Sequence, residues 1–97
     1  MRAVEFYREA RLEIEEAVAW YDAQEVSGLG DRLLGEIETA LHKARTLPEA
    51  FPVVDGRNRR VILKRFPYGL FFREEEHGIL VVAFFHSRRD PSRRSGR

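Results

Sequence analysis

Hydrophobic and polar positions divide the chain into a helical first half and a strand-rich second half. From residue 9 to residue 21, apolar side chains recur every three or four positions, as one face of an amphipathic helix requires. The same spacing returns after a break at Ser27-Gly28 and closes at Pro48. The positions that define the two helices are Ala10, Ile14, Ala17, Val18 and Tyr21, then Leu34, Ile37, Leu41, Ala44 and Leu47. This pattern predicts a helical hairpin.

Three apolar runs in the second half, residues 61–63, 70–72 and 79–85, are typical of β-strands. The turn Phe66-Pro67-Tyr68-Gly69 separates the first two, and the polar residues 74–78 separate the last two, which predicts an antiparallel meander. Residues 79–85 contain no polar position, so we expect this strand to be covered on both faces and flanked by other strands.

Alternation within residues 60–66 assigns side chains to the two faces of the first strand of the meander. It places Val61, Leu63 and Arg65 on one face. It places Ile62, Lys64 and Phe66 on the other face. This strand should therefore carry cations beside apolar residues.

The remaining segments complete the expected fold. Residues 2–6 alternate weakly, with Val4 and Phe6 on one side, and can form a strand at the edge of the sheet. Residues 49–58 contain two turn signals and should form a connecting loop. We therefore expect an α+β fold of order β-α-α-β-β-β, with the hairpin packed on one face of a four-stranded, mainly antiparallel sheet. Residues 1–91 should form one domain and residues 92–97 a mobile basic tail.

The amino-acid composition limits the class of protein and the means by which it can be stabilised. The 97 residues suffice for one hydrophobic core, and 43% hydrophobic with 34% charged residues is the composition of an ordinary globular protein. There is no cysteine, so neither a disulfide nor a thiolate metal site is possible. No signal peptide or membrane-spanning stretch is recognisable, and we expect a cytoplasmic protein without a membrane partner.

Charge is unevenly distributed along the chain. Residues 1–56 contain 6 Lys/Arg against 12 Asp/Glu, whereas residues 57–97 contain 11 against 4. A basic segment that coincides with the sheet favours a polyanionic or acidic partner, because local potential steers charged ligands. Solvated surface arginines are the alternative interpretation.

Two motifs, Arg65-Phe66-Pro67-Tyr68 and His86-Ser87-Arg88-Arg89-Asp90-Pro91, resemble those of the RelE/ParE toxin family of type II toxin–antitoxin systems. Weaker matching positions are Ala10, Trp20-Tyr21, Leu29-Gly30, Pro48, Phe51-Pro52 and Arg60-Val61. The resemblance implies a toxin that a cognate antitoxin neutralises by wrapping around it, with operator DNA contacted only through the antitoxin. RelE-like members cleave messenger RNA on the ribosome, and ParE-like members inhibit DNA gyrase without a recognised hydrolytic site.

An RNA-cleaving member would need an acid, a base and cations for the phosphorane charge. His86 could serve as acid or base, and Arg65, Arg73, Arg88 and Arg89 could hold phosphate oxygens. Alternatively, His86 could be a hydrogen-bonded residue that closes its strand, with Arg88 and Arg89 bridging sheet and tail. The chain is therefore expected to be an endoribonuclease if it is RelE-like and not an enzyme if it is ParE-like.

Nuclease members commonly carry an arginine where their third strand opens and an aromatic residue or histidine at the end of the chain. This chain has Tyr68-Gly69 at the first place and neither residue type beyond Pro91. The resemblance is therefore closer to the ParE-like branch, and we expect inhibition of gyrase and replication. A RelE-like endoribonuclease and a non-toxic, antitoxin-binding regulator are the alternatives. The candidate contacts with target or antitoxin are Arg60, Lys64, Arg65, Arg73, His86, Arg88 and Arg89.

Other residues with possible chemistry have simpler interpretations. His42 and His77 lack partners at metal-ligand spacing, so we expect no metal and no cofactor. The pair Trp20-Tyr21 could contact an antitoxin or a second copy, but packing of the helix is the favoured interpretation. Aromatic residues within the strands are expected in the core rather than stacked on bases; they are Tyr68, Phe71, Phe72, Phe84 and Phe85.

Overall fold

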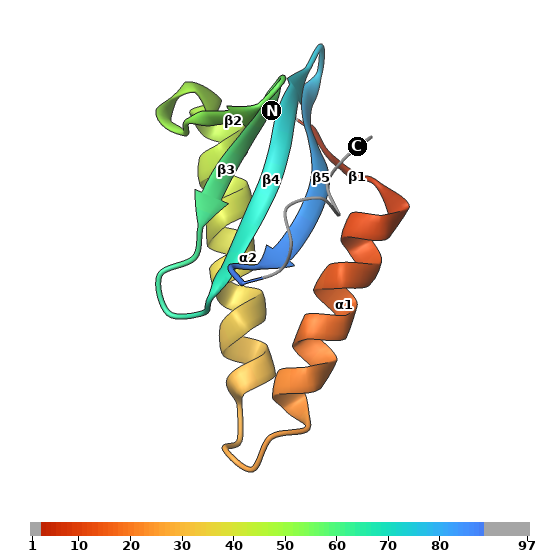
Figure 1. Cartoon of the computed structure of the whole chain (residues 1–97), viewed down its shortest axis with the longest axis vertical. Helices are drawn as coiled ribbons and strands as arrows, with labels where there is room; N and C mark the ends of the chain where they lie inside the picture. Colours follow the sequence, from red (N-terminus) through yellow and green to blue (C-terminus); the bar gives the residue numbers. More distant parts are fainter. Residues whose placement is uncertain (1–2, 89–97) are drawn as a thin grey trace.

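The computed structural model describes residues 3–88 and has the expected α+β architecture. Both helices lie on the same side of a twisted sheet (Figure 1). The elements in chain order are β1 (Ala3–Phe6), α1 (Arg8–Asp22), α2 (Leu29–Thr46), the 3₁₀ turn η1 (Pro48–Ala50), β2 (Val53–Asp55), β3 (Asn58–Ile62), β4 (Tyr68–Glu75) and β5 (Gly78–His86). No helix within this described part is long and apolar enough to cross a membrane.

Within residues 3–88 the sheet contains five strands in the order β1-β5-β4-β3-β2, one more than predicted. β5 is flanked by β4, which is antiparallel to it, and by β1, which is parallel, so the prediction of a flanked strand is confirmed. The additional strand, β2, lies within the predicted loop 49–58 and pairs with β3 through only two residue pairs. Its three residues lie between Pro52 and Gly56. Because these two neighbours are typical turn residues, the sequence predicted a loop there instead of a strand.

The two helices have the predicted spacing, and Ile37 and Ala44 of α2 are buried as predicted, but Leu33 and Ala40 are buried more fully than their predicted neighbours Leu34 and Leu41. Its buried residues are Gly30, Leu33, Ile37, Ala40 and Ala44. Leu34 and Leu47, which were expected in the core, are 41% and 52% exposed. A shift of one residue rotates a helical position by about 100°, and the line through Leu33 faces the sheet instead. In α1, Ala10 and Ala17 are buried as predicted.

Apolar side chains fill both faces of the central strands. The helix-side cluster joins the two helices to Leu70, Phe72, Ile79, Val81 and Phe84. A second cluster lies on the other face and contains Phe71, Val82, Ala83 and Phe85. The unbroken apolar run of β5 is thus explained by burial on both faces, and the strand phenylalanines belong to the core as expected.

The predicted alternation holds along β3 but fails after it. Val61 is buried and Ile62 is exposed, yet β3 ends at Ile62. The carboxylate of Glu36, on α2, then accepts hydrogen bonds from the backbone N–H groups of Lys64 (3.0 Å) and Arg65 (3.3 Å). The chain turns there. Arg65 is therefore exposed, although it was assigned to the face of the buried Val61, and Phe66 is buried, although it was assigned to the face of the exposed Ile62.

Candidate interaction surfaces

His86 ends β5 beside the turn that precedes β4. Its ring lies edge-on to Tyr68, with 5.2 Å between ring centroids. Its Nδ1 accepts a hydrogen bond from the backbone N–H of Arg88 at 3.1 Å, which puts the proton of a neutral ring on Nε2. The N–H of Ser87 donates to the carbonyl oxygen of Pro67 at 2.7 Å. This histidine therefore helps to fasten the end of β5 to the Phe66-Pro67-Tyr68 turn.

Arg73 lies near the other end of β4 and is held by residues of this chain. Its Nη2 donates to the hydroxyl oxygen of Tyr7 at 2.7 Å, and its guanidinium lies over the Tyr7 ring at 5.5 Å from the centroid. Its Nε is 3.8 Å from a carboxylate oxygen of Glu75. Arg73 thereby links β4 to the residue that precedes α1.

The register of β4 and β5 separates these two candidate catalytic residues. Tyr68 is opposite His86, whereas Arg73 is opposite Leu80. Because a strand rises about 3.3 Å per residue, residues 80 and 86 are roughly 20 Å apart along β5. Among the predicted nuclease residues, Arg65 and Arg88 lie near the His86 end, and Arg73 does not.

Part of the basic charge in β3 and just before it is already paired with carboxylates near the β4–β5 hairpin. Arg59 donates to the carbonyl oxygen of Phe51 at 2.6 Å and approaches the Glu74 carboxylate at 3.4 Å. Arg57 contacts the Glu75 carboxylate at 3.0 Å. The excess of positive charge counted in the sequence therefore overstates the positive charge that a partner would contact near the β4–β5 hairpin.

Arg60 lies on the face of the sheet opposite the helices. It stands across from Phe71, and its side-chain stem passes beside Gly69. Its Nε and that of Arg73 are buried without a hydrogen-bond partner within residues 3–88, as is Oδ1 of Asn58. These Nε atoms are buried, and that of Arg73 lies 3.8 Å from a carboxylate oxygen of Glu75, so neither is presented at the surface of the helix-free face.

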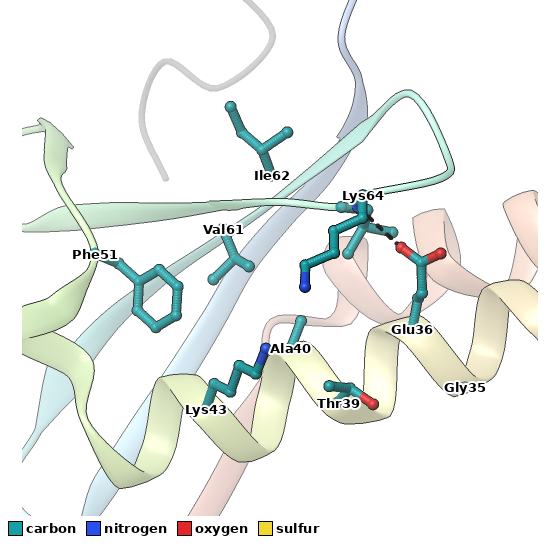
Figure 2. Close-up of a pocket in the computed structure, with 10 residues that line it drawn as sticks. Gly35, Glu36, Thr39, Ala40, Lys43, Phe51, Val61, Ile62 and Lys64 are labelled. Atoms are coloured by element: carbon teal, nitrogen blue, oxygen red, sulfur yellow. Dashed lines mark hydrogen bonds between the residues drawn. The ribbon is translucent and has the colours of Figure 1, made fainter.

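Lys64 faces a cavity of about 270 Å³ between α2 and β3. Figure 2 shows Lys64 from the β3 side and Lys43 from α2, both pointing into this cavity. Its apolar lining includes Ala40, Phe51 and Val61. Sequence reasoning named Lys64 but missed Lys43, because no local pattern indicates that residues on a helix and on a distant strand share a cavity.

Two other hollows lie where the helices approach the Phe66-Pro67-Tyr68 turn and the sheet. One, of about 420 Å³, is lined by Tyr21, Leu29, Arg32, Glu36, Arg65 and Phe66. The other, of about 180 Å³, is lined by Glu13, Glu16, Ala17, Trp20, Tyr68 and Phe84. Trp20 is 58% exposed, so the expectation that it packs within the fold is wrong, whereas Tyr21 packs against Phe66.

Several sequence-based expectations concern residues beyond the described part. Arg89, the rest of the motif through Pro91 and the tail 92–97 lie outside residues 3–88. Within those described residues, no cluster of three or more His, Asp or Glu side chains is arranged to hold a metal ion.

Comparison with known proteins places this geometry in context. Residues 4–91 match the family described as the ParE toxin of the type II toxin–antitoxin system parDE. The fold is similar to a solved chain of the chromosomal ParDE toxin–antitoxin system from P. aeruginosa, with a TM-score of 0.74 and 15% sequence identity. That match covers 89% of this chain and 96% of the other. A search of curated proteins finds no relative that matches.

Proposed function

Since the chain belongs to the ParE toxin family of type II toxin–antitoxin systems, we propose that it arrests growth by binding DNA gyrase and not by cleaving RNA. A cognate antitoxin neutralises it and supplies the contact with operator DNA. The proposal thus describes a toxin that acts by occupying a protein surface and carries out no hydrolysis.

One observation carries this proposal, namely the separation of His86 from Arg73. General acid–base catalysis needs its groups within hydrogen-bond reach of one reacting centre. Roughly 20 Å of strand lies between these residues, and each is engaged inside the fold, His86 with Arg88 and Arg73 with Tyr7. The arrangement favours structural roles for both residues.

The contacts with gyrase or antitoxin are proposed to involve the cations that remain exposed. Lys64 and Arg65 project from the segment after β3, and Arg88 follows β5 at the same end of the sheet. None of these three side chains forms an ion pair within the described residues. Cations of this kind mainly raise the rate of association with an acidic surface.

The decisive experiment is induced expression of the chain without antitoxin, with DNA and protein synthesis followed by separate pulse labels in one culture. We expect DNA synthesis to stop first while translation continues, and purified toxin to inhibit supercoiling by gyrase. Early arrest of translation would replace this proposal with ribosome-dependent RNA cleavage. Unimpaired growth would replace it with a non-toxic, antitoxin-binding regulator.

A pair of substitutions tests the assignment of roles. His86→Ala and Arg73→Ala should each keep killing activity within about threefold, because neither residue performs chemistry in this proposal. Circular dichroism of both variants should confirm that they fold. Loss of killing by a folded variant that still binds antitoxin would contradict a purely structural role.

A further inference from the structure

The helix-free face of the sheet is buried, although within residues 3–88 no helix or strand lies over it. Phe71 and Phe85 are each 4% exposed and Val82 is 1% exposed. Both helices lie on the other side of the sheet (Figure 1). Among the described residues, partly buried side chains such as Tyr7 only border this cluster. Apolar positions on an open sheet face would contact water, so their burial indicates a further covering segment.

The N-terminus is too short to cover this face. Residues 1–2 precede Ala3, which pairs with Gly78 at the opposite end of β5 from Phe85. A strand rises about 3.3 Å per residue, so roughly 23 Å separate Gly78 from Phe85, whereas two residues span at most about 7 Å. The C-terminal segment, residues 89–97, is the other part of the chain outside the described residues.

The described chain ends next to the last phenylalanine of the helix-free face. The N–H of Ser87 donates to the carbonyl oxygen of Pro67 at 2.7 Å, and the N–H of Arg88 donates to Nδ1 of His86 at 3.1 Å. These bonds hold the chain close to Phe85, where the C-terminal segment begins. Residues 89–97 can extend over as much as about 30 Å, which is enough to cross the face along β5.

Arg60 contributes a charge to this face that lacks a counter-ion. Its stem passes Gly69, where a Cβ atom would lie 3.5 Å from Cδ of the arginine. Because Gly69 pairs with Phe85, the stem extends across β4 in the direction of β5. Within residues 3–88 the guanidinium forms no ion pair. The C-terminal segment contains a single carboxylate side chain, that of Asp90, near its start.

The arginines of the segment suit the phenylalanine rings of the face. The rings of Phe71 and Phe85 lie 6.0 Å apart. Arginine stems cover apolar surface while their guanidinium groups stay in water, and a guanidinium is attracted to the face of an aromatic ring. Arg73 already lies over the Tyr7 ring in this way. The acidic side of α1 also attracts arginines, but an arginine bound there would leave the phenylalanines uncovered.

We propose that the helix-free face binds the chain's own C-terminal segment, residues 89–97. The carboxylate of Asp90 lies beside the guanidinium of Arg60, and arginine stems lie over Phe71 and Phe85. The segment thereby shields an apolar face that would otherwise favour association between copies. In this proposal residues 92–97 belong to the folded domain and are not the mobile tail expected from their composition. The inference does not depend on gyrase being the cellular target.

The first test locates the segment by paramagnetic relaxation in ¹H–¹⁵N NMR spectra of the full chain. The sequence contains no cysteine, so Ser92→Cys provides a single attachment point for a nitroxide. We expect the amide signals of Phe71 and Val82 to lose about threefold more intensity than that of Trp20 on α1, because the bound state predominates. Equal losses, or a larger loss at Trp20, would overturn the proposal.

A mixed sample identifies which copy supplies the segment. Nitroxide-labelled chain at natural isotope abundance is added to unlabelled ¹⁵N chain. We expect no loss of intensity at Val82 in this mixture, because each face is covered by its own segment. A loss there would identify the segment of a second copy as the occupant and refute the proposal.

An exchange of charges tests the pairing of Asp90 with Arg60. Asp90→Arg and Arg60→Asp should each release the segment and raise the fluorescence of 8-anilinonaphthalene-1-sulfonate about threefold or more, because this dye reports exposed apolar surface. The double variant should restore the low signal. Arg32→Gln, an exposed position on α2, is the control and should leave the signal unchanged. Unchanged fluorescence in both single variants would contradict the proposed pair.

Removal of the segment tests the covering role without changing the face itself. A chain that ends at Arg88 should bind the dye as strongly as the single variants, and hydrogen exchange should accelerate at Val82 and Ala83. Circular dichroism of each variant should confirm that it folds. Low dye fluorescence in the folded, shortened chain would show that residues 89–97 do not cover the face.

Discussion

At the scale of single residues, Gly78 is packed closely against the backbone of a neighbouring strand. It opens β5 and pairs with Ala3 of β1. A methyl group on Gly78 would lie 2.0 Å from the carbonyl oxygen of Ala3 and 2.7 Å from its nitrogen. These atoms belong to the backbone and cannot rotate away. The N–H of Ala3 also donates to the carbonyl oxygen of His77 at 2.9 Å, so the whole start of β1 is fixed at this point.

Gly78→Ala should therefore lower the free energy of unfolding by about 1–3 kcal/mol, because β1 must move to admit the methyl group. Urea denaturation measures the loss, and amide hydrogen exchange should accelerate in β1 before other strands. Gly35→Ala is the control. A methyl group there meets nothing within 4 Å, and helix propensity should raise the stability by about 0.5–1 kcal/mol. Equal stabilities of the two variants would contradict this account.

At the scale of elements, the end of α1 is joined to the turn before β4 by one aromatic residue. Tyr21 packs edge-on to Phe66 with 4.9 Å between centroids, and lies 6.3 Å from Tyr68. Its neighbour Trp20 contacts only the edge of Tyr21 among the described rings and is mostly exposed. Tyr21 and not Trp20 therefore makes the packing contacts between α1 and the turn.

Tyr21→Ala should cost about 2–4 kcal/mol of unfolding free energy, because it opens a cavity between α1 and the turn. Trp20→Ala should cost less than about 1 kcal/mol, since its ring leaves little apolar area buried. Urea denaturation followed by far-ultraviolet circular dichroism compares the two. A larger loss for the tryptophan variant would show that the side chain has a packing role.

The local pattern of apolar and polar residues predicted the elements whose own residues favour the structure that they adopt in the fold. Both helices and the three meander strands were recognised in this way, and so was edge strand β1. β2 was missed because three residues form a strand only when β3 lies beside them. The rotation of α2 toward Leu33 was missed because Leu34 satisfies the same spacing, and only the sheet distinguishes the two positions.

The candidate surfaces were less predictable than the fold. Composition indicated a basic sheet, but the pairing of Arg57 and Arg59 with Glu74 and Glu75 depends on the register of three strands. The same register separates His86 from Arg73. It is set by a tight connection between Glu75 and Gly78, and the polar run 74–78 did not specify which of its residues belonged to the strands.

At the scale of the whole molecule, the layers share one helix-side core. Side chains from β1, both helices and the three meander strands meet in a single cluster. Neither the hairpin nor the sheet can bury its apolar face without the other. The protein should therefore behave as one cooperative unit.

Thermal unfolding should accordingly follow a two-state transition. Scanning calorimetry should give equal calorimetric and van't Hoff enthalpies, about 60–80 kcal/mol for a domain of this size. Near- and far-ultraviolet circular dichroism should change together. A separate early transition in the far-ultraviolet signal would mean that the hairpin melts independently.

The parallel pairing of β1 with β5 also determines the order of events during synthesis. Residues 3–6 leave the ribosome long before their strand partner, residues 78–81. α1 likewise packs against β5. Contacts between residues so distant in sequence form late in folding, because the intervening chain must first be ordered. The sheet is thus completed only after β5 has been synthesised, and β1 has no strand partner until then.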